Sequence, residues 1–249
     1  MYHGIKREYV MNHSILYTKE NHTAIITLNR PKKRNAINQD LLTNLYNALE
    51  SAAKDDEISA IIITGNGKSF CAGIDLAALA DDDLFDPRGD GRDMVDVFKD
   101  CPKPILGAVN GHAITGGFEL ALNCDFLIAS EGASFADTHA RVGIHPGWGM
   151  TQLLQQAVGQ RMAKQLSLTC EFITADHALR IGLVNEILPE DRLLDRAKEI
   201  AESIASVNQQ MMATVKNLIE HRNTTSFEEA VIEERKGFQV FVDTLLKEK

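Results

Sequence analysis

Glu119 is the side chain of this sequence with the clearest setting for proton chemistry. It follows the pair Gly116-Gly117, and apolar residues then recur at helical spacing, so a helix is predicted to begin at the glycines. A helix start presents unpaired N–H groups and the positive end of the helix dipole, which suits a negatively charged oxygen. Glu119 could act as a base on whatever the glycines hold. From these residues alone, the commoner alternative is that Glu119 only complements the dipole.

A second group of chemistry-bearing residues is cationic and comprises Arg30, Lys32, Lys33 and Arg34. Four cations in five positions stand out on a chain whose formal net charge is −9. They predict either a phosphate-binding site or a solvated loop, and the sequence leaves both readings open. The small residues from Cys71 to Gly73 lead into an apolar segment and offer a second place for an exposed N–H.

Composition restricts the class of protein. With 249 residues, 44% of them hydrophobic and 24% charged, the chain can bury a substantial core, and no apolar run approaches a membrane span. The segment from Met1 to Val10 lacks the apolar stretch of a secretory signal. The acidic balance disfavours nucleic acid as a partner. No Cys-x-x-Cys pair occurs among Cys71, Cys101, Cys124 and Cys170. We therefore expect reduced thiols, no metal site and a cytoplasmic protein.

The first half of the chain alternates predicted strands and helices. Ser14–Tyr17 and Thr23–Leu28 have the pattern of a β-hairpin, and Asn38 can cap a helix whose leucines repeat on one face. The run Ala60–Thr64 is apolar throughout, which predicts a strand buried on both faces of a sheet. Ile105–Val109 predicts a further strand, directly before the glycines.

The second half becomes helical. The acidic segment Ala80–Asp100 predicts a mobile loop or a short, broken helix, and Gln152–Leu168 predicts one continuous helix. From Asp191 onward only helices are predicted, the last opened by a capping box of Ser226 and Glu229. The fold class is therefore α/β with a helical C-terminal part, divided into residues 1–190 and 191–249.

Several motifs together carry a family resemblance. They are Leu28-Asn29-Arg30-Pro31, Asn35-Ala36, Gly67-Lys68-Ser69-Phe70-Cys71-Ala72-Gly73-Ile74-Asp75-Leu76, Val109-Asn110-Gly111-His112-Ala113, Gly116-Gly117-Phe118-Glu119-Leu120-Ala121, Cys124-Asp125 and Pro146-Gly147. With them the chain resembles the crotonase superfamily, the enoyl-CoA hydratase/isomerase family, from about Ile15 to the last helix. The resemblance implies a crotonase-like spiral of ββα units with a helical C-terminal trimerisation region. It also implies an acyl-CoA thioester substrate, no cofactor beyond that coenzyme A, and a homotrimer or dimer of trimers.

The resemblance also implies roles for individual residues. It assigns the backbone N–H groups of Ile74 and Gly116 to the thioester oxygen, where the loss of one such donor costs about 3 kcal/mol. Because proton removal or water addition beside a thioester places negative charge on that oxygen, two preorganised donors stabilise it. The coenzyme A portion is assigned to Arg34, Ala36, Ala72, Asp75 and Leu76.

One position departs from the family's hydratase pattern. Hydratases of the family hold a water with two glutamates; Glu119 matches the first, whereas His139 stands at the second. An imidazole can replace a carboxylate in acid/base work, since it titrates near neutral pH. The alternative is that His139 only lines the pocket. Asp137 is a less suitable substitute, because alternate residues of an extended segment stand about 6.5 Å apart.

Hydration of a 2-enoyl-CoA in acyl-CoA metabolism is therefore the predicted function, with Glu119 and His139 as catalytic residues. An isomerase or a thioester hydrolase that uses Glu119 alone is the alternative, since either chemistry can run with one base. A non-catalytic acyl-CoA-binding homologue is the remaining one, favoured only by His139.

Overall fold

The computed structural model describes residues 10–12 and 14–247 of the chain. The segment from Met1 to Val10, expected not to be a secretory signal, therefore lies outside the described residues except for Val10. The chain divides into two compact units, one ending at Ser206 and the other beginning at Val207.

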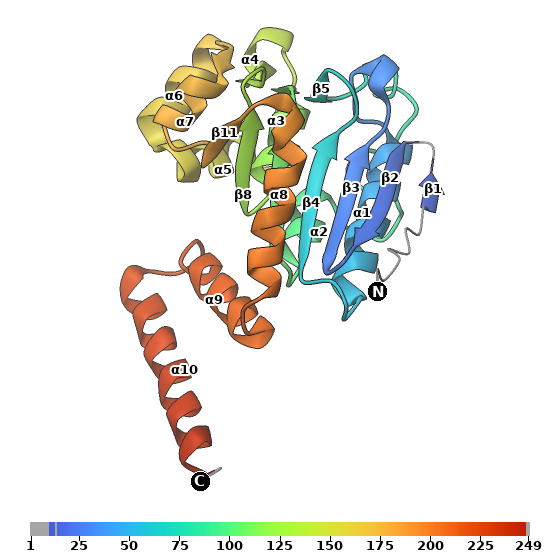
Figure 1. The fold of residues 1–249 in the computed structure, drawn as a ribbon. Helices are drawn as coiled ribbons and strands as arrows, with labels where there is room; N and C mark the ends of the chain where they lie inside the picture. The colour runs from blue at the N-terminus through green and yellow to red at the C-terminus, as the bar shows by residue number, and fades with distance from the viewer. Residues whose placement is uncertain (1–9, 13, 248–249) are drawn as a thin grey trace. The chain divides into compact units, whose positions relative to one another are not determined.

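A seven-stranded sheet forms the centre of the first unit (Figure 1). Its strands follow the order β1 (Val10–Asn12), β2 (Ile15–Glu20), β3 (Thr23–Leu28), β4 (Ala60–Gly65), β6 (Ile105–Val109), β8 (Phe126–Ser130) and β11 (Glu186–Leu188). The first three strands pair antiparallel, which confirms the predicted hairpin. Every later pair in this sheet is parallel.

A second sheet of four strands takes the alternate strands of the chain. Its order is β10 (Ile173–Thr174), β9 (Ser134–Ala136), β7 (His112–Ile114) and β5 (Ser69–Cys71). Each of β4, β6 and β8 in the first sheet is followed directly by β5, β7 or β9 in the second, and helices follow β7 and β9. This repeated ββα path is the predicted spiral, so the expected fold class is confirmed.

Helices connect the strands of the first unit. They are the short 3₁₀-helix η1 (Pro31–Lys33), α1 (Gln39–Lys54), α2 (Met94–Lys99), α3 (Gly116–Leu122), α4 (His139–Val142), α5 (Met150–Val158), α6 (Gln160–Thr169), α7 (Ala175–Arg180) and α8 (Glu190–Ala205). The Asn38 side chain accepts the N–H of Leu41 at 3.1 Å, so the predicted cap of α1 is present. The single helix predicted over Gln152–Leu168 is wrong, because Gly159 adopts φ 79° and separates α5 from α6.

Strand β4 explains how the sheet divides the core. Ile61 and Ile63 belong to a large buried cluster on one face, whereas Ile62 packs on the other face in a smaller cluster with Leu193 and Ala197 of α8. A strand whose first four residues are all apolar is thus buried on both sides, as predicted. Because α8 covers the second face, it belongs to the α/β unit, and the division expected after residue 190 comes at Ser206 instead.

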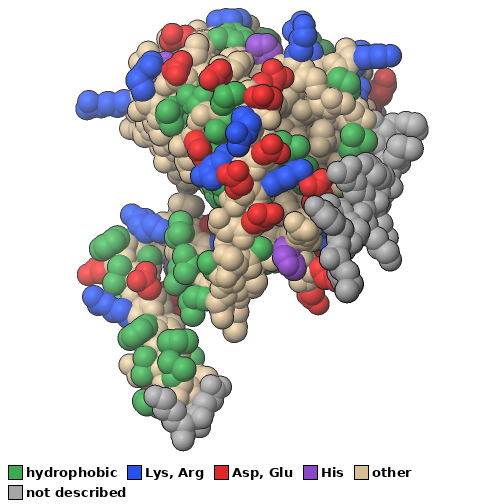
Figure 2. Space-filling view, viewed as in Figure 1, with side chains coloured by type: hydrophobic (Ala, Val, Ile, Leu, Met, Phe, Trp, Pro, Cys, Tyr) green, Lys and Arg blue, Asp and Glu red, His purple; other side chains and the backbone are tan. Residues whose placement is uncertain are grey.

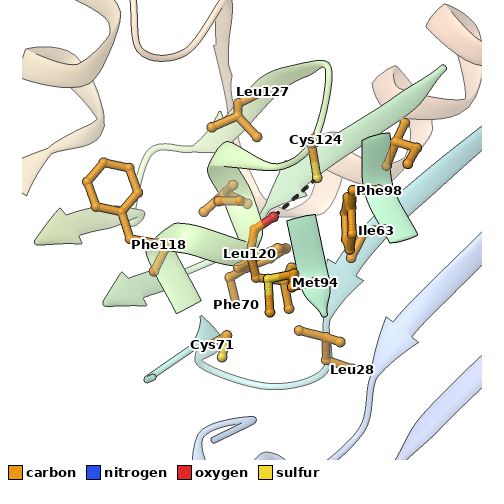
Figure 3. Packing of buried hydrophobic residues seen from close by; sticks show 14 of the residues in the cluster. Leu28, Ile63, Phe70, Cys71, Met94, Phe98, Phe118, Leu120, Cys124 and Leu127 are labelled. Carbon is orange, nitrogen blue, oxygen red and sulfur yellow. Dashed lines mark hydrogen bonds between the residues drawn. The ribbon is translucent and has the colours of Figure 1, made fainter. Parts of the chain in front are cut away.

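The larger cluster also holds the helix that carries Glu119. Figure 3 shows Leu120 of α3 among other buried side chains, including Phe70 of β5 and Met94 of α2, and the Cys124 thiol donates to the Leu120 carbonyl at 3.7 Å. Close packing of this kind leaves little freedom for rigid-body movement. The position of Glu119 is therefore set by the core.

The acidic segment Ala80–Asp100 is tied to α1. Arg88 and Arg92 both contact the carboxylate of Glu50, at 2.9 and 2.6 Å. Within the segment, α2 begins at a capping box formed by Asp93. Residues 80–91 form turns and bends, and α2 follows them, so the segment contains both a loop and a short helix.

The second unit consists of α9 (Gln209–His221) and α10 (Phe227–Lys247). The predicted capping box is present, since the Ser226 N–H donates to Glu229 Oε2 (2.9 Å) and the Glu229 N–H donates to Ser226 Oγ (3.2 Å). No described residue of either helix is buried. Apolar side chains gather on the surface of these helices (Figure 2), the exposed large ones being Met211, Val215, Ile219, Phe227, Ile232, Phe238, Val240, Phe241, Leu245 and Leu246. Across the described residues, no helix has the length and apolar character to cross a membrane.

Candidate active site

Glu119 is a buried carboxyl group with one oxygen fixed by the backbone. Its residue is 1% exposed, and Oε1 accepts the N–H groups of Trp148 (2.9 Å) and Met150 (3.3 Å). Burial raises the pKa of Glu119 above its ordinary value, although these two N–H groups and the nearby His139 oppose the shift. The protonated form of Glu119 is therefore more populated than that of an exposed glutamate. Because both backbone N–H groups bind Oε1, Oε2 remains available to contact a substrate or a water.

His139 faces the second oxygen of Glu119. It is the first residue of α4, is buried, and places Nε2 at 3.6 Å from Glu119 Oε2. That separation is too long for a direct hydrogen bond. Two polar atoms at that separation can still both bond one water. The structure thus brings together the two side chains that the sequence proposed as a pair.

Asp137 lies on the other side of the His139 ring. Its Oδ1 is 2.7 Å from Nδ1 of His139 and accepts the His139 backbone N–H at 3.1 Å. The assumption of an extended segment, which separated these side chains, is wrong because Thr138 has φ −105° and ψ 12° and turns the chain. Burial raises the pKa of Asp137, but hydrogen bonds from His139 and Ser167 outweigh it, so the pKa lies below the ordinary value. The sequence signal for this contact was an Asp-x-His spacing just before a helix start.

The turn before α5 supplies the groups that hold Glu119. Asn123, the residue that follows α3, holds this turn by donating to the Trp148 carbonyl at 2.9 Å. Trp148 is 1% exposed, packs against the Phe85 ring with centroids 5.4 Å apart, and has no hydrogen-bond partner for its indole N–H within the described chain. A Cβ on Gly116 would lie 3.2 Å from Cζ3 of this indole. Trp148 therefore forms an apolar wall at the start of α3, a role the sequence did not resolve.

Ile74 and Gly116, the two expected backbone donors, are neighbours. A Cβ on Gly116 would lie 3.5 Å from Cγ1 of Ile74. Ile37 pairs with Ile74 in a parallel bridge, in which the Ile37 N–H donates to Gly73 and its carbonyl accepts from Asp75, both at 2.8 Å. In such a bridge the N–H of Ile74 points away from Ile37. The N–H of Gly116, at the first position of α3, has no acceptor within the helix.

The cationic cluster divides into one inward side chain and three exposed ones. Arg30 donates to Asp75 Oδ2 at 3.0 Å and to the Ala36 carbonyl. This hydrogen bond from Arg30 lowers the pKa of Asp75. Arg30 therefore joins the segment at Ala36 to the segment at Asp75, and its charge is already paired.

Arg34 lies on the surface beside the same junction, together with Lys32 and Lys33. Its carbonyl accepts the N–H of Ala72 at 3.0 Å, so two of the segments assigned to coenzyme A are in contact. Leu76, at the end of the second segment, is 69% exposed. An anion could reach these groups from solvent.

Thiol and metal chemistry find little support in this structure. All four cysteines are buried, and burial raises the pKa of Cys71 to about 12, so its thiolate is scarce near neutral pH. Within the ranges that the structure describes, no group of three or more His, Cys, Asp or Glu residues could hold a metal ion.

Known proteins resemble this chain along most of its length. The sequence profile of the enoyl-CoA hydratase/isomerase family matches residues 18–248. A probable peroxisomal enoyl-CoA hydratase 1 of Arabidopsis thaliana is 39% identical over 226 residues, covering 91% of this chain and 85% of that protein. A crotonyl-CoA hydratase of Syntrophomonas wolfei is 42% identical, covering 79% of this chain and 77% of its own.

A solved structure agrees with this assignment. The crystal structure of an enoyl-CoA hydratase from Mycobacterium avium superposes with a TM-score of 0.75 at 39% identity, covering 92% of this chain and 99% of that one. Matches of this extent, in sequence and in fold, establish the family. The chain belongs to the enoyl-CoA hydratase/isomerase family.

Proposed function

We propose that this protein adds water across the double bond of a 2-enoyl-CoA thioester. The observation that carries the proposal is the pair of Glu119 Oε2 and His139 Nε2, which face each other at 3.6 Å. This pair lies by the start of α3, where the N–H of Gly116 has no acceptor in the helix. Hydration needs one group that takes a proton and one that gives a proton, and the pair can supply both.

The reaction follows from these positions. The thioester oxygen would accept the N–H groups of Ile74 and Gly116, which stabilise the negative charge that develops on it. As the water oxygen bonds C3, Nε2 of His139 accepts the water proton. Glu119, whose pKa burial raises, delivers its proton to C2. The proton taken up by His139 then passes to the Glu119 carboxylate through a water between them, which restores both groups. Coenzyme A enters as part of the substrate, and the scheme needs no further cofactor or metal.

Assays with three substrates test this function. The expected result is hydration of crotonyl-CoA, followed as loss of the enoyl absorbance. Conversion of a 3-enoyl-CoA without hydration would favour an isomerase that uses Glu119 alone, whereas release of free thiol from a saturated acyl-CoA would favour a thioester hydrolase. Binding without turnover of any of them would identify a non-catalytic acyl-CoA-binding protein.

Arg34 is expected to hold a phosphate of coenzyme A. Its exposed guanidinium lies beside the junction of the two segments assigned to that group, and Arg34→Glu replaces attraction by repulsion. Because this binding is shared by ground and transition states, KM for crotonyl-CoA should rise roughly tenfold or more while kcat changes little. Arg161→Glu, on the exposed surface of α6, is the matched control. An unchanged KM in Arg34→Glu would assign the cluster to a solvated loop.

We also propose that the protein assembles as a trimer or a dimer of trimers. The exposed apolar side chains of α9 and α10 indicate a surface that a partner covers. In this family the usual partner is a second copy of the same chain. Sedimentation at micromolar concentration should give the mass of three or six chains. The double variant Phe238→Glu/Phe241→Glu should shift the mass downward, whereas Gln239→Lys, on the same helix, should not. A wild-type monomer would contradict the proposal.

A cytoplasmic location remains our proposal for the compartment. Four buried cysteines are compatible with a reducing environment. One relative is named as peroxisomal, so imaging or fractionation of the tagged chain is the appropriate test.

A further inference from the structure

We propose that Asp137 is a positioning residue, which holds His139 in the tautomer that leaves Nε2 open as a proton acceptor toward Glu119. The effect of Asp137 on turnover rests on the proposed hydration, whereas its contact with His139 does not depend on that function.

The contact fixes both the ring and its proton. Oδ1 of Asp137 lies 2.7 Å from Nδ1 of His139 and also accepts the His139 backbone N–H at 3.1 Å. An ionised carboxylate has no proton to donate, so the hydrogen of this bond belongs to Nδ1. In a neutral imidazole, Nε2 then carries the lone pair.

The opposite tautomer of His139, with its proton on Nε2, would prevent Glu119 and His139 from acting together on a water. With its proton on Nε2, neutral His139 would have no lone pair on the nitrogen that faces Oε2 of Glu119 at 3.6 Å. Nε2 could then donate to a water but could not accept its proton. Asp137 opposes this state because its carboxylate would then face the lone pair of Nδ1.

The surroundings keep Asp137 ionised. Burial raises its pKa, but hydrogen bonds from His139 and from Ser167 of α6 outweigh it. Within the described chain, the charged groups that face His139 are Asp137 from its own segment and Glu119 from α3. The neutral hydroxyl of Ser167 is what α6 presents to Asp137. No other charge competes with Asp137 for Nδ1 in these interactions.

Two variants of the full chain test the contact directly. ¹⁵N-histidine NMR of the wild-type protein should show His139 with its proton on Nδ1, and Asp137→Ala should lose that preference. Asp137→Asn, which keeps the shape of the side chain, provides a second variant if the alanine variant melts far below wild type. Asp176→Asn, on the exposed surface of α7, is the matched control. Unchanged His139 signals in both Asp137 variants would overturn the proposal even if hydration fails.

Kinetics then test the consequence. Asp137→Ala should lower kcat by roughly 10²-fold, because the tautomer that leaves Nε2 open to accept a proton is then no longer favoured. In the His139→Ala background, removal of Asp137 should cost nothing further, because Asp137 acts through His139. An additive loss in the double variant would mean a general structural role and would overturn the proposal.

Discussion

Glu119→Gln should abolish hydration, by roughly 10³-fold or more in kcat, while His139→Ala should lose roughly 10²-fold. Gln keeps an acceptor for the N–H groups of Trp148 and Met150 but cannot give or take a proton. The larger effect is expected at Glu119 because it delivers the proton to C2. The loss at His139 is smaller because a water in the space left by the imidazole can still take a proton.

Initial rates with crotonyl-CoA and thermal melts of the same samples measure this split. Glu131→Gln, at an exposed turn between β8 and β9, is the matched control and should retain full activity. If His139→Ala keeps near-full turnover while Glu119→Gln is inactive, the two-group mechanism fails. A single-base isomerase then becomes the better description, and assays with a 3-enoyl-CoA would follow.

Gly117→Ala should strongly destabilise the folded protein. A Cβ at this position would lie 2.0 Å from the carbonyl oxygen of Cys71 and 2.6 Å from its carbonyl carbon, so the backbone of β5 would have to move away from α3. Overpacking typically costs about 1–3 kcal/mol, and a clash with backbone belongs at or beyond the upper end. For a chain of this size the melting temperature should fall by roughly 10 °C or more.

Gly132→Ala separates this clash from the general effect of losing a glycine. No atom lies within 4 Å of a Cβ at Gly132, and its φ is not in the left-handed region. Its stability should therefore stay within about 0.5 kcal/mol of wild type. Equal melting temperatures for the Gly117 and Gly132 variants, measured by calorimetry, would show that β5 and α3 are less closely packed than the structure has them.

The sequence alone determined most of the local structure. The apolar run from Ala60 predicted the buried strand β4, and the caps at Asn38 and Ser226 predicted where α1 and α10 begin. These features follow from periodicity and from hydrogen bonds between residues three or four apart, so a short window of sequence contains them. The same logic placed Glu119 in the first turn of a helix and singled out His139.

Only the tertiary structure decided how the site is held. The amides that fix Glu119 come from Trp148, 29 residues away, and from Met150, and nothing in either segment alone predicts that they meet. Asp137 reaches His139 because Thr138 turns the chain, against the extended path that simple alternation suggested. The boundary between the two units lies at Ser206 and not after residue 190, because α8 packs on the sheet. Local propensity sets the elements, whereas these contacts depend on how distant elements pack and on single backbone angles that the packed core selects.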